Sequence, residues 1–430
     1  MIFKTSQNLI KFNDKLSLTA ANKRKIFNDP VYGFITIPNE LLFDIIEHPY
    51  FQRLRRIRQL GLTHLVYPGA LHTRYHHSVG AMYLMNLAIK TLRDKGQEIT
   101  QEEANGALIA ILLHDIGHGP YSHTLEHSIV DGILHEDISA IYMDKLNDLY
   151  GNQLELGIKI FRNEYHKTFL HKLVSSQLDM DRLDYLKRDS FFTGVSEGII
   201  NADRIIKMLQ IVDDDIVVEA KGIYSIEKFI IARRLMYWQV YLHKTVVAAE
   251  YMLMKVLKRA KELAGHGVEL FATTAFKTFL NQQLTKKDFI ENEEILRQFS
   301  KLDDFDIFTS IKEWTNHSDK ILSYLSQCIV NRRLFRIEIQ SEPFSDEKFN
   351  DFKLKTMREF GISENEVDYL VFKDLTSNYA YNPEGGNINI LFKDGTIADM
   401  SKAADQLNIS VLSQPVTKHF LCYPKVINYR

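Results

Sequence analysis

The stretch His114-Asp115-Ile116-Gly117-His118-Gly119-Pro120-Tyr121-Ser122-His123 directly follows an apolar run from Ala107 to Leu113. It places three histidines and an aspartate within ten residues, and both residue types bind metals. The stretch therefore predicts a metal site with acid and base groups beside it. A His-Asp pair alone is a weak signal, because it also fits an ordinary helix end that packs or faces water.

Two distant segments carry residues that would complete a metal site. His77 lies in His72-Thr73-Arg74-Tyr75-His76-His77-Ser78, directly before an apolar-periodic segment from Val79 to Leu92. Asp181 lies in Ser176-Gln177-Leu178-Asp179-Met180-Asp181-Arg182-Leu183-Asp184-Tyr185. Two nitrogen and two oxygen donors leave positions on a divalent ion open for water and a phosphate oxygen. The predicted metal ligands are His77, His114, Asp115 and Asp181.

Several longer strings resemble one protein family closely. They are Phe51-Gln52-Arg53-Leu54-Arg55, Tyr67-Pro68-Gly69-Ala70, His114 to His123 and Asp181-Arg182-Leu183-Asp184-Tyr185. In this order they resemble the HD-domain metal-dependent phosphohydrolases, and within them the deoxynucleoside triphosphate (dNTP) triphosphohydrolases. The resemblance runs from about Lys25 to about Lys244, and the last hundred residues are only loosely similar. It implies a mainly α-helical HD-domain fold and a divalent metal ion, with Mg, Mn, Fe, Zn and Ni all open.

Composition is typical of a soluble enzyme. A chain of 430 residues with 45% hydrophobic residues can bury a large core, and we expect two lobes. Two cysteines argue against a disulfide framework and favour a reducing cytoplasm. No apolar run approaches the roughly 18 residues of a membrane span, and the N-terminus lacks the apolar core of a signal peptide. Because the net charge is only −2, we expect neither membrane nor nucleic-acid partners.

Apolar residues at helical spacing dominate residues 1–330, which we expect to form a helical core containing the metal site within residues 50–245. Examples of expected helices are Glu102–Leu113, Ile138–Leu149, Ser225–Leu263 and Lys287–Phe299. An exception lies between Ile211 and Tyr224. There Ile216-Val217-Val218-Glu219, followed by Lys221-Gly222, predicts a small hairpin.

The pattern changes after about Arg333, and residues 331–430 predict a small α/β lobe. Leu334 to Ile339 alternate apolar and charged residues, as a half-buried strand does. Further strands are expected at Tyr369–Phe372, Ile388–Phe392 and His419–Cys422. Lys393-Asp394-Gly395 is a turn signal. The expected helices of this lobe are Ser345–Phe360 and Met400–Leu407.

The resemblance also implies catalytic groups. His123 matches the histidine that protonates the leaving 5′-oxygen, and imidazole titrates in the right range for that role. His118 matches a residue that contacts the reacting phosphate. His135 matches a third active-site histidine, paired with an acidic residue that is Glu126 here and the shorter Asp in the animal enzyme. The alternative is that two of these three histidines extend a second metal site.

A basic and aromatic set is implied for the triphosphate, because guanidinium groups match phosphate oxygens bidentately. Its members are Arg74, Arg182, Tyr185, Arg233 and Lys244. Residues 233, 237, 241 and 244 lie on one face if the helix is continuous, and such a face is also typical of an exposed basic surface. The resemblance places the sugar pocket at Gln59, Leu60, Asp189 and Tyr241. Leu60-Gly61-Leu62 also fits a helix terminus with a C-cap glycine.

Regulation is implied by a partial match only. Lys25, Asn28 and Arg55 fall on a guanine-nucleotide site that drives assembly in the animal enzyme, and Glu47 replaces an Asp there. We therefore expect a homo-oligomer, either dimer or tetramer, with a guanine-nucleotide activator. Asn28-Asp29-Pro30 also fits a simple turn. The basic cluster around Arg55 equally fits salt bridges to a neighbouring helix.

The expected activity is hydrolysis of a dNTP to a deoxynucleoside and inorganic triphosphate. Other phosphohydrolase reactions stay open, namely those of a nucleotide monophosphatase or a guanosine polyphosphate hydrolase. A nucleotide-sensing regulatory protein is a third reading, against which the intact set of four ligands argues.

Overall fold

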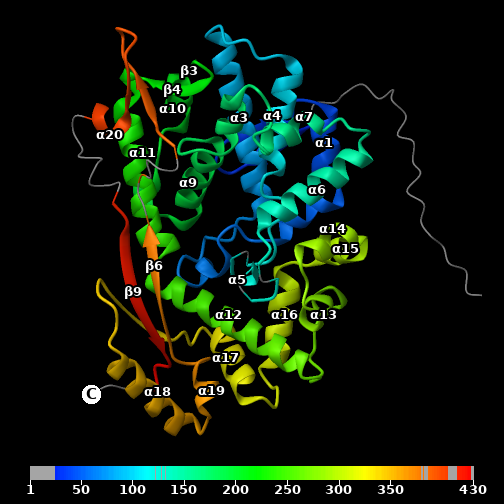
Figure 1. Cartoon of the computed structure of the whole chain (residues 1–430), viewed down its shortest axis with the longest axis vertical. Coiled ribbons are helices and arrows are strands. Elements are labelled where there is room, and N and C mark those ends of the chain that lie inside the picture. Colours follow the sequence, from blue (N-terminus) through cyan, green and yellow to red (C-terminus); the bar gives the residue numbers. More distant parts are fainter. Residues whose placement is uncertain are drawn as a thin grey trace, which may run out of the picture.

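The computed structural model describes residues 25–378, 381, 386–404 and 414–427, apart from Ser122, His127 and Asp131 and the side chains of His123 and Glu126. Helices dominate this part of the chain, and its strands form three small sheets (Figure 1). The expected class, a mainly helical fold with a C-terminal α/β region, is confirmed.

Helices of the first half follow clear local signals. Helix α4 begins with a capping box, in which the side chains of Thr100 and Glu103 each accept from the other's backbone N–H. Helix α9 begins after Asp179, which caps it, and ends at Gly194 in the left-handed conformation. The helices are α1 (Glu40–Glu47), α2 (Pro49–Gln52), α3 (Arg74–Asp94), α4 (Gln101–Leu113), α5 (His123–Glu126), α6 (His135–Leu149), α7 (Glu155–Phe161), α8 (Thr168–Val174), α9 (Met180–Thr193) and α10 (Ala202–Met208). Short 3-10 turns are η1 (Arg53–Arg56), η2 (Gly61–Leu65), η3 (Ser196–Gly198) and η4 (Ala220–Gly222). The helices expected at Glu102–Leu113 and Ile138–Leu149 are confirmed.

The second half contains two interruptions that helical spacing did not reveal. The helical segment expected at Ser225–Leu263 is confirmed as helical but is not continuous, because a π-helical turn, η5 (Tyr237–Tyr241), separates α11 from α12. Lys287–Phe299 is likewise two helices, because Asn292 adopts an extended conformation and caps the second one. The helices are α11 (Ile223–Met236), α12 (Lys244–Gly265), α13 (Thr274–Asn281), α14 (Lys286–Glu291), α15 (Glu293–Lys301), α16 (Asp304–Trp314), α17 (Lys320–Val330), α18 (Asp346–Phe360), α19 (Glu364–Val367) and α20 (Met400–Ala403). Helix α18 confirms the prediction at Ser345–Phe360, and α20 confirms the start of Met400–Leu407, whose last residues lie outside the described part.

Three sheets complete the fold. The N-terminal hairpin pairs β1 (Ile26–Asp29) with β2 (Gly33–Thr36). The second sheet has the order β3 (Leu209–Val212), β4 (Asp215–Glu219), β7 (Asn389–Leu391) and β8 (Ile397–Asp399). The third has the order β5 (Arg336–Gln340), β9 (Val416–Tyr423) and β6 (Phe372–Asn378).

Most strand predictions are confirmed, with one error at β6. The small hairpin expected between Ile211 and Tyr224 is confirmed as β3–β4, which turns at Asp213 and Asp214, both with positive φ, whereas Lys221 and Gly222 lie in η4. Strand β6 starts at Phe372, where the prediction ended, because residues 368–371 form turns that follow α19.

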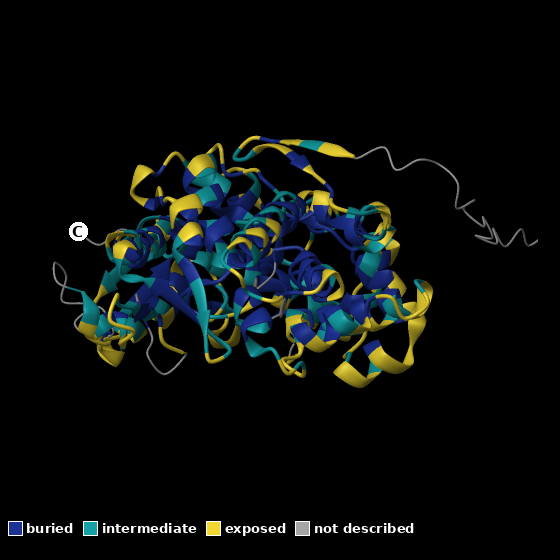
Figure 2. Cartoon of the chain, turned by 90° about the horizontal axis from the view of Figure 1, so that it is seen from above, coloured by how far each residue is buried: buried dark blue, intermediate teal, exposed yellow. Residues whose placement is uncertain are grey.

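The C-terminal segment packs back onto the helical part. Strand β4 pairs in parallel with β7, and Leu334, Phe372 and Phe420 belong to the same buried cluster as α12. Buried residues run through the centre of the molecule, whereas β1 and β2 lie at its edge (Figure 2). A smaller cluster joins α18, α19 and β9. The division into residues 1–330 and 331–430 stays a prediction. Among the described residues, no helix is long and apolar enough to span a membrane.

One buried carboxyl group should make stability depend on pH. Asp304 begins α16 and accepts a hydrogen bond from the Arg58 backbone N–H at 3.0 Å, and burial raises its pKa from 3.8 to about 6. A raised pKa means that its contribution to stability is present below about pH 4 and is lost as pH rises through 6. The free energy of unfolding of Asp304→Asn, relative to that of the parent, should therefore rise by about 2–3 kcal/mol as the pH goes from 4 to 7. Urea unfolding at both pH values measures this, and a constant difference would contradict it.

Candidate active site

Three helices bring the four predicted metal ligands together. His77 lies in the first turn of α3, His114 and Asp115 directly follow α4, and Asp181 lies in the first turn of α9. Helix α3 packs against both α4 and α9. Because each ligand stands near a helix end, its side chain reaches the junction without having to share a helix face with the others.

Ligand atoms of His77, His114 and Asp181 lie within 4.8 Å of one another, and Asp115 lies beside them with a different carboxylate oxygen toward each histidine. His77 Nε2 lies 3.1 Å from Asp181 Oδ1 and 3.8 Å from Asp115 Oδ2. His114 Nε2 lies 3.3 Å from Asp115 Oδ1 and 3.6 Å from Asp181 Oδ1. Two donors bound at about 2.1 Å from one ion, at octahedral or tetrahedral angles, lie roughly 3.0–3.4 Å apart. The observed spacing therefore fits a divalent ion after small adjustments.

Both histidines present the nitrogen that a metal needs. His77 donates its Nδ1–H to Asp184 Oδ2 at 2.9 Å, and His114 donates its Nδ1–H to the Ile111 carbonyl at 2.6 Å. Each Nε2 then faces the other predicted ligands, with Asp181 Oδ1 3.1 Å from His77 Nε2 and 3.6 Å from His114 Nε2. Within the described part of the chain both Nε2 atoms are buried, and neither makes a hydrogen bond of good geometry. A buried orphan nitrogen is costly, so a bound cation would satisfy both at once.

The electrostatics point the same way. Burial lowers the pKa of His77, but the carboxylates of Asp181 and Asp184 outweigh it and raise that pKa to about 10. Despite burial, the neighbouring histidines hold the pKa of Asp181 far below its ordinary range. The cluster thus attracts positive charge strongly, and a divalent cation would supply it while displacing the protons.

A second group of possible ligands lies beside the first. Ligand atoms of Asp115, His118 and His135 lie within 4.8 Å of one another, and the His118 and His135 rings stack with centroids 3.6 Å apart. However, Arg74 donates Nη1–H to Asp115 Oδ2 at 2.6 Å, which places a fixed positive charge beside any second cation. Burial and Arg74 also hold the pKa of His118 well below its ordinary value. The arrangement disfavours a charged His118, while its contact with a phosphate and the two-ion alternative both stay predictions.

Two predicted catalytic residues cannot be placed. His123 and Glu126 bound the short helix α5, but their side chains lie outside the described residues. Their roles in proton transfer remain predictions.

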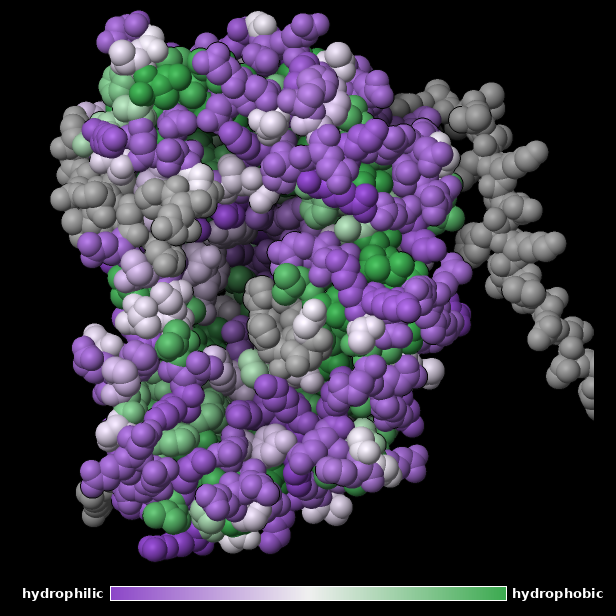
Figure 3. All heavy atoms as spheres, in the orientation of Figure 1, coloured by the Kyte–Doolittle hydropathy of each residue, from purple (hydrophilic) through white to green (hydrophobic). Residues whose placement is uncertain are grey.

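A cavity of about 470 Å³ opens beside the ligands and collects most of the predicted substrate residues. Figure 3 shows the same face of the molecule hollowed near its middle, with hydrophilic residues around the hollow. The predicted residues in its lining are Gln59, Leu60, Arg74, Asp115, His118, His135, Asp181, Arg182, Tyr185, Asp189 and Tyr241. Tyr237 of the expected basic and aromatic face also lines the cavity. Further lining residues had no predicted role, and they include Thr63, Tyr121, Thr124, Leu242 and Glu250.

The sugar-pocket candidates are joined by hydrogen bonds. The Tyr241 hydroxyl donates to Asp189 Oδ2 at 2.7 Å, and His72 Nε2 donates to Asp189 Oδ1 at 2.7 Å. The π-helical turn delivers Tyr237 and Tyr241 to the cavity wall, and π-turns are frequent at functional sites. His72 was missed, because a buried histidine two residues before Arg74 carries no signal of its partner.

Two predicted phosphate ligands lie outside the lining. Because the helix is interrupted, Lys244 begins α12 at an exposed position instead of sharing a face with Arg233. Arg233 donates to the Gln177 side chain at 3.0 Å and lies over the Tyr237 ring. The expected common face holds for residues 233, 237 and 241, whose side chains contact one another in order, but Lys244 begins a separate helix.

The basic cluster of residues 53–58 is dispersed by the fold. Arg53 is fully buried and donates to the Ile116 carbonyl at 2.9 Å, whereas Arg56 pairs with Asp303. Arg55 is exposed, with its guanidinium 3.6 Å from the Tyr75 ring centroid, and no acidic partner for it is found in the described part of the chain. Lys25, Asn28 and Glu47 are exposed too. The regulatory role of these residues stays a prediction.

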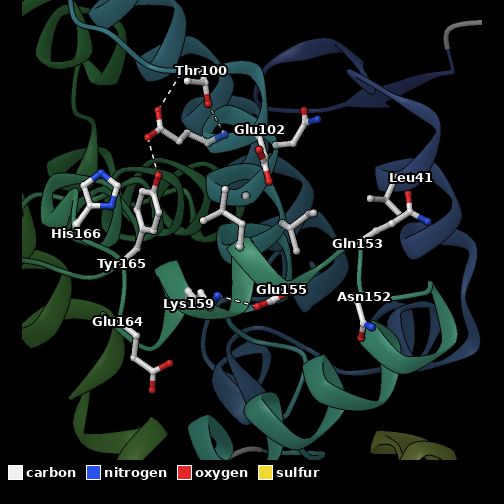
Figure 4. A pocket seen from close by; sticks show the side chains of 15 residues that line it. Leu41, Thr100, Glu102, Asn152, Gln153, Glu155, Lys159, Glu164, Tyr165 and His166 are labelled. Carbon is white, nitrogen blue, oxygen red and sulfur yellow. Dashed lines mark hydrogen bonds and ion pairs between the residues drawn. The ribbon is translucent and has the colours of Figure 1, made fainter.

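Another cavity in the described part of the chain is separate from the candidate site. About 1000 Å³ in volume, it is lined by α4, α7 and the segments that flank α7 (Figure 4). Its polar groups largely satisfy one another, since Lys159 pairs with Glu155 at 2.7 Å and Glu103 accepts from the Tyr165 hydroxyl at 2.8 Å. Neither group of possible metal ligands in the described residues lies there.

Comparison with known proteins agrees with the site. The HD domain family matches residues 74–189, and the HD associated region matches residues 200–273. An uncharacterized protein of Bacillus subtilis, YwfO, is 33% identical over 96% of this chain and 94% of its own length. A crystal structure of a phosphohydrolase from Bacteroides thetaiotaomicron is 54% identical with a TM-score of 0.91, covering 93% of this chain and 100% of that one. The deoxynucleoside triphosphate triphosphohydrolase SAMHD1 of Danio rerio is 34% identical over 43% of this chain and 36% of its own length.

The fold and the metal-ligand cluster define a metal-dependent phosphohydrolase. The chain belongs to the HD-domain family that is related to the deoxynucleoside triphosphate triphosphohydrolases. The family expected from the sequence is thereby confirmed.

The ligand assignment predicts the metal content of two variants. His114→Ala and Asp115→Ala each delete a donor, so both should bind less than about a tenth of the ion that the parent binds. His171→Ala is a matched control, because its Nδ1 also contacts a backbone carbonyl, Ile160 at 2.9 Å, but it belongs to no ligand cluster in the described residues. Elemental analysis after gel filtration measures the ion. Full occupancy in either variant would refute the assignment.

Proposed function

We propose that this protein hydrolyses a dNTP to a deoxynucleoside and inorganic triphosphate. The observation that carries the proposal is one cavity in which metal ligands and arginines adjoin a Tyr241–Asp189 pair. The first part suits a polyphosphate and the second suits a sugar hydroxyl. The sequence relationship to dNTP triphosphohydrolases supports the same substrate class.

The chemistry divides among the residues as follows. When bound, a divalent ion would activate water and neutralise charge on the phosphoryl oxygens. The attacking water oxygen forms a bond to the α-phosphorus, and the bond from that phosphorus to the 5′-oxygen breaks. The leaving 5′-oxygen takes a proton, for which His123 is our candidate donor.

The arginines are placed to hold the phosphates. Arg74 is buried against Asp115, so it reaches the same phosphate as the ion. Arg182 follows Asp181 and is steadied by Asp179, whose Oδ2 lies 3.5 Å from its Nη1. Both guanidinium groups are paired with carboxylates, which fixes their direction before substrate arrives.

The product distinguishes this reaction from its alternatives. Purified protein, incubated with each dNTP and with Mg²⁺, Mn²⁺, Fe²⁺, Zn²⁺ or Ni²⁺ in turn, should release a deoxynucleoside and triphosphate in equal amounts, as resolved by ion-exchange chromatography. His114→Ala provides the background from contaminating phosphatases. Release of pyrophosphate or orthophosphate, or no turnover with any ion, would contradict the proposal.

Sugar selectivity should depend on the Tyr241 ring. Tyr241→Ala opens space beside Asp189, so the ratio of dNTP to ribonucleotide turnover should fall roughly 10–100-fold. Tyr241→Phe is the matched control, because it keeps the ring and loses only the hydroxyl that donates to Asp189. It should retain the ratio while raising KM. Equal ratios in Tyr241→Ala and the parent would show that this ring does not exclude the 2′-hydroxyl.

A further inference from the structure

We propose that Asp29, in the N-terminal hairpin, is a positioning residue for the metal centre, acting through Arg188 and Asp184 on His77. The proposal rests on the proposed function only in assuming that His77 binds a metal ion. Its test measures metal binding directly and does not depend on turnover.

A continuous chain of buried polar contacts joins the hairpin to the ligand. Arg188 Nη1 donates to Asp29 Oδ2 at 2.8 Å. On its other side Arg188 grips Asp184 with two bonds, from Nε to Oδ2 at 2.9 Å and from Nη2 to Oδ1 at 3.0 Å. Asp184 Oδ2 accepts the Nδ1–H of His77 at 2.9 Å. The same carboxylate oxygen therefore receives both the arginine and the metal ligand.

Burial makes these contacts interdependent. The side chains of His77, Asp184 and Arg188 have no exposed surface, and that of Asp29 is 5% exposed. Removing one member of such a group leaves a buried charge without compensation, which is strongly destabilising locally. Without Asp29, Arg188 would be drawn fully to Asp184. That pull would weaken the hold of Asp184 on the His77 imidazole.

The packing leaves the chain almost no freedom to relax. Gly80 lies one turn after His77 on α3, and a Cβ there would come within 2.1 Å of Arg188 Nη2 and 2.2 Å of Asp184 Oδ1. The arginine–carboxylate pair thus lies directly against bare helix backbone. A displacement of Arg188 has to move Asp184 with it.

Asp29 uses different carboxylate oxygens for the hairpin turn and for the chain of contacts through Arg188 and Asp184 to His77, which we call the relay. Its Oδ1 accepts the backbone N–H groups of Val31 and Tyr32, both at 2.9 Å, while Oδ2 holds Arg188. The Tyr32 ring lies over the same guanidinium, 5.5 Å from it. Position of the hairpin is therefore coupled to the orientation of a metal ligand, although the hairpin lies at the edge of the molecule (Figure 2).

Because the two oxygens of Asp29 make separate contacts, one substitution can remove the contact with Arg188 and keep those of the turn. Asp29→Asn keeps an oxygen for the turn and removes the charge that faces Arg188. We expect the dissociation constant for Mn²⁺, measured by calorimetric titration, to rise roughly 10–100-fold. The visible absorption spectrum of the Co²⁺-loaded protein should change as well, because it reports ligand geometry. In turnover, kcat should fall more than KM changes.

The matched control is Asp394→Asn. Asp394 also caps a turn, accepting the Thr396 backbone N–H at 3.0 Å, but it is exposed and far from the metal ligands in sequence. It should bind Mn²⁺ as the parent does. Unchanged Mn²⁺ affinity and Co²⁺ spectrum in Asp29→Asn would overturn the proposal, since the relay would then end at Arg188.

A second variant tests the proposal if Asp29→Asn does not fold. Asp29→Glu restores the charge with one extra methylene, and it should bind Mn²⁺ with an affinity between those of the parent and Asp29→Asn. If only Asp29→Glu folds, parent-like affinity and spectrum in it would overturn the proposal. The two proposals can fail separately. If the parent hydrolyses no dNTP but a folded Asp29 variant binds Mn²⁺ more weakly than the parent, the role of Asp29 is supported and the proposed function is refuted.

Discussion

The buried negative charge between α3, α4 and α9 is the constraint on which the site depends. Asp115, Asp181 and Asp184 lie close together and are wholly or mostly buried. Three histidines and three arginines lie within 4.0 Å of them, namely His77, His114, His118, Arg74, Arg182 and Arg188. Carboxylates in such a place require compensation by cations. Arg188 pairs with Asp184, the most buried of the three carboxylates, and Arg74 pairs with Asp115. These pairs offset part of the negative charge where the three helices meet, and the proposed ion would offset the rest.

The ends of the helices, more than their faces, create this site. The turn after α4 has to carry His114 and Asp115 around the helix end, and its geometry is fixed from both sides. Arg53 donates to the Ile116 carbonyl, and Ser139 of α6 donates to the His114 carbonyl while accepting the Gly117 N–H. A Cβ at position 117 would lie 2.2 Å from the His135 carbonyl, so only glycine permits this close approach. Metal ligands and the first turn of α6 are thereby held in one rigid unit.

Sequence reasoning succeeded where the signal was local or where a motif recurred in order. The ligand-bearing segments, α4, α6 and α18 were predictable, because helical spacing and His-Asp motifs are visible within one segment. The break at Tyr237–Tyr241 was not, since a π-turn leaves the apolar pattern nearly intact and is stabilised by tertiary contacts. The contacts of Asp29 and His72 with residues more than a hundred positions away were equally hidden, because one sequence carries no information about which polar groups meet. The same reason explains why Arg53, Arg55 and Arg56, adjacent in sequence, have unrelated partners.

The π-turn and the relay have opposite effects on the backbone and side chains around the candidate site. The proposed chain of contacts from Asp29 to His77 would fix the direction of that imidazole, as a metal ligand requires. The π-turn departs from regular helix to bring Tyr237 and Tyr241 to the wall of the cavity, where Tyr241 meets Asp189. Asp189 in turn lies five residues after Asp184 on α9, so one helix carries both the carboxylate that holds His77 and the carboxylate that Tyr241 contacts. On the proposed function, helix α9 would set the distance between the reacting phosphate and the sugar. A substrate would have to match that distance at both ends, and a rigid helix would thereby turn a fixed spacing into selectivity.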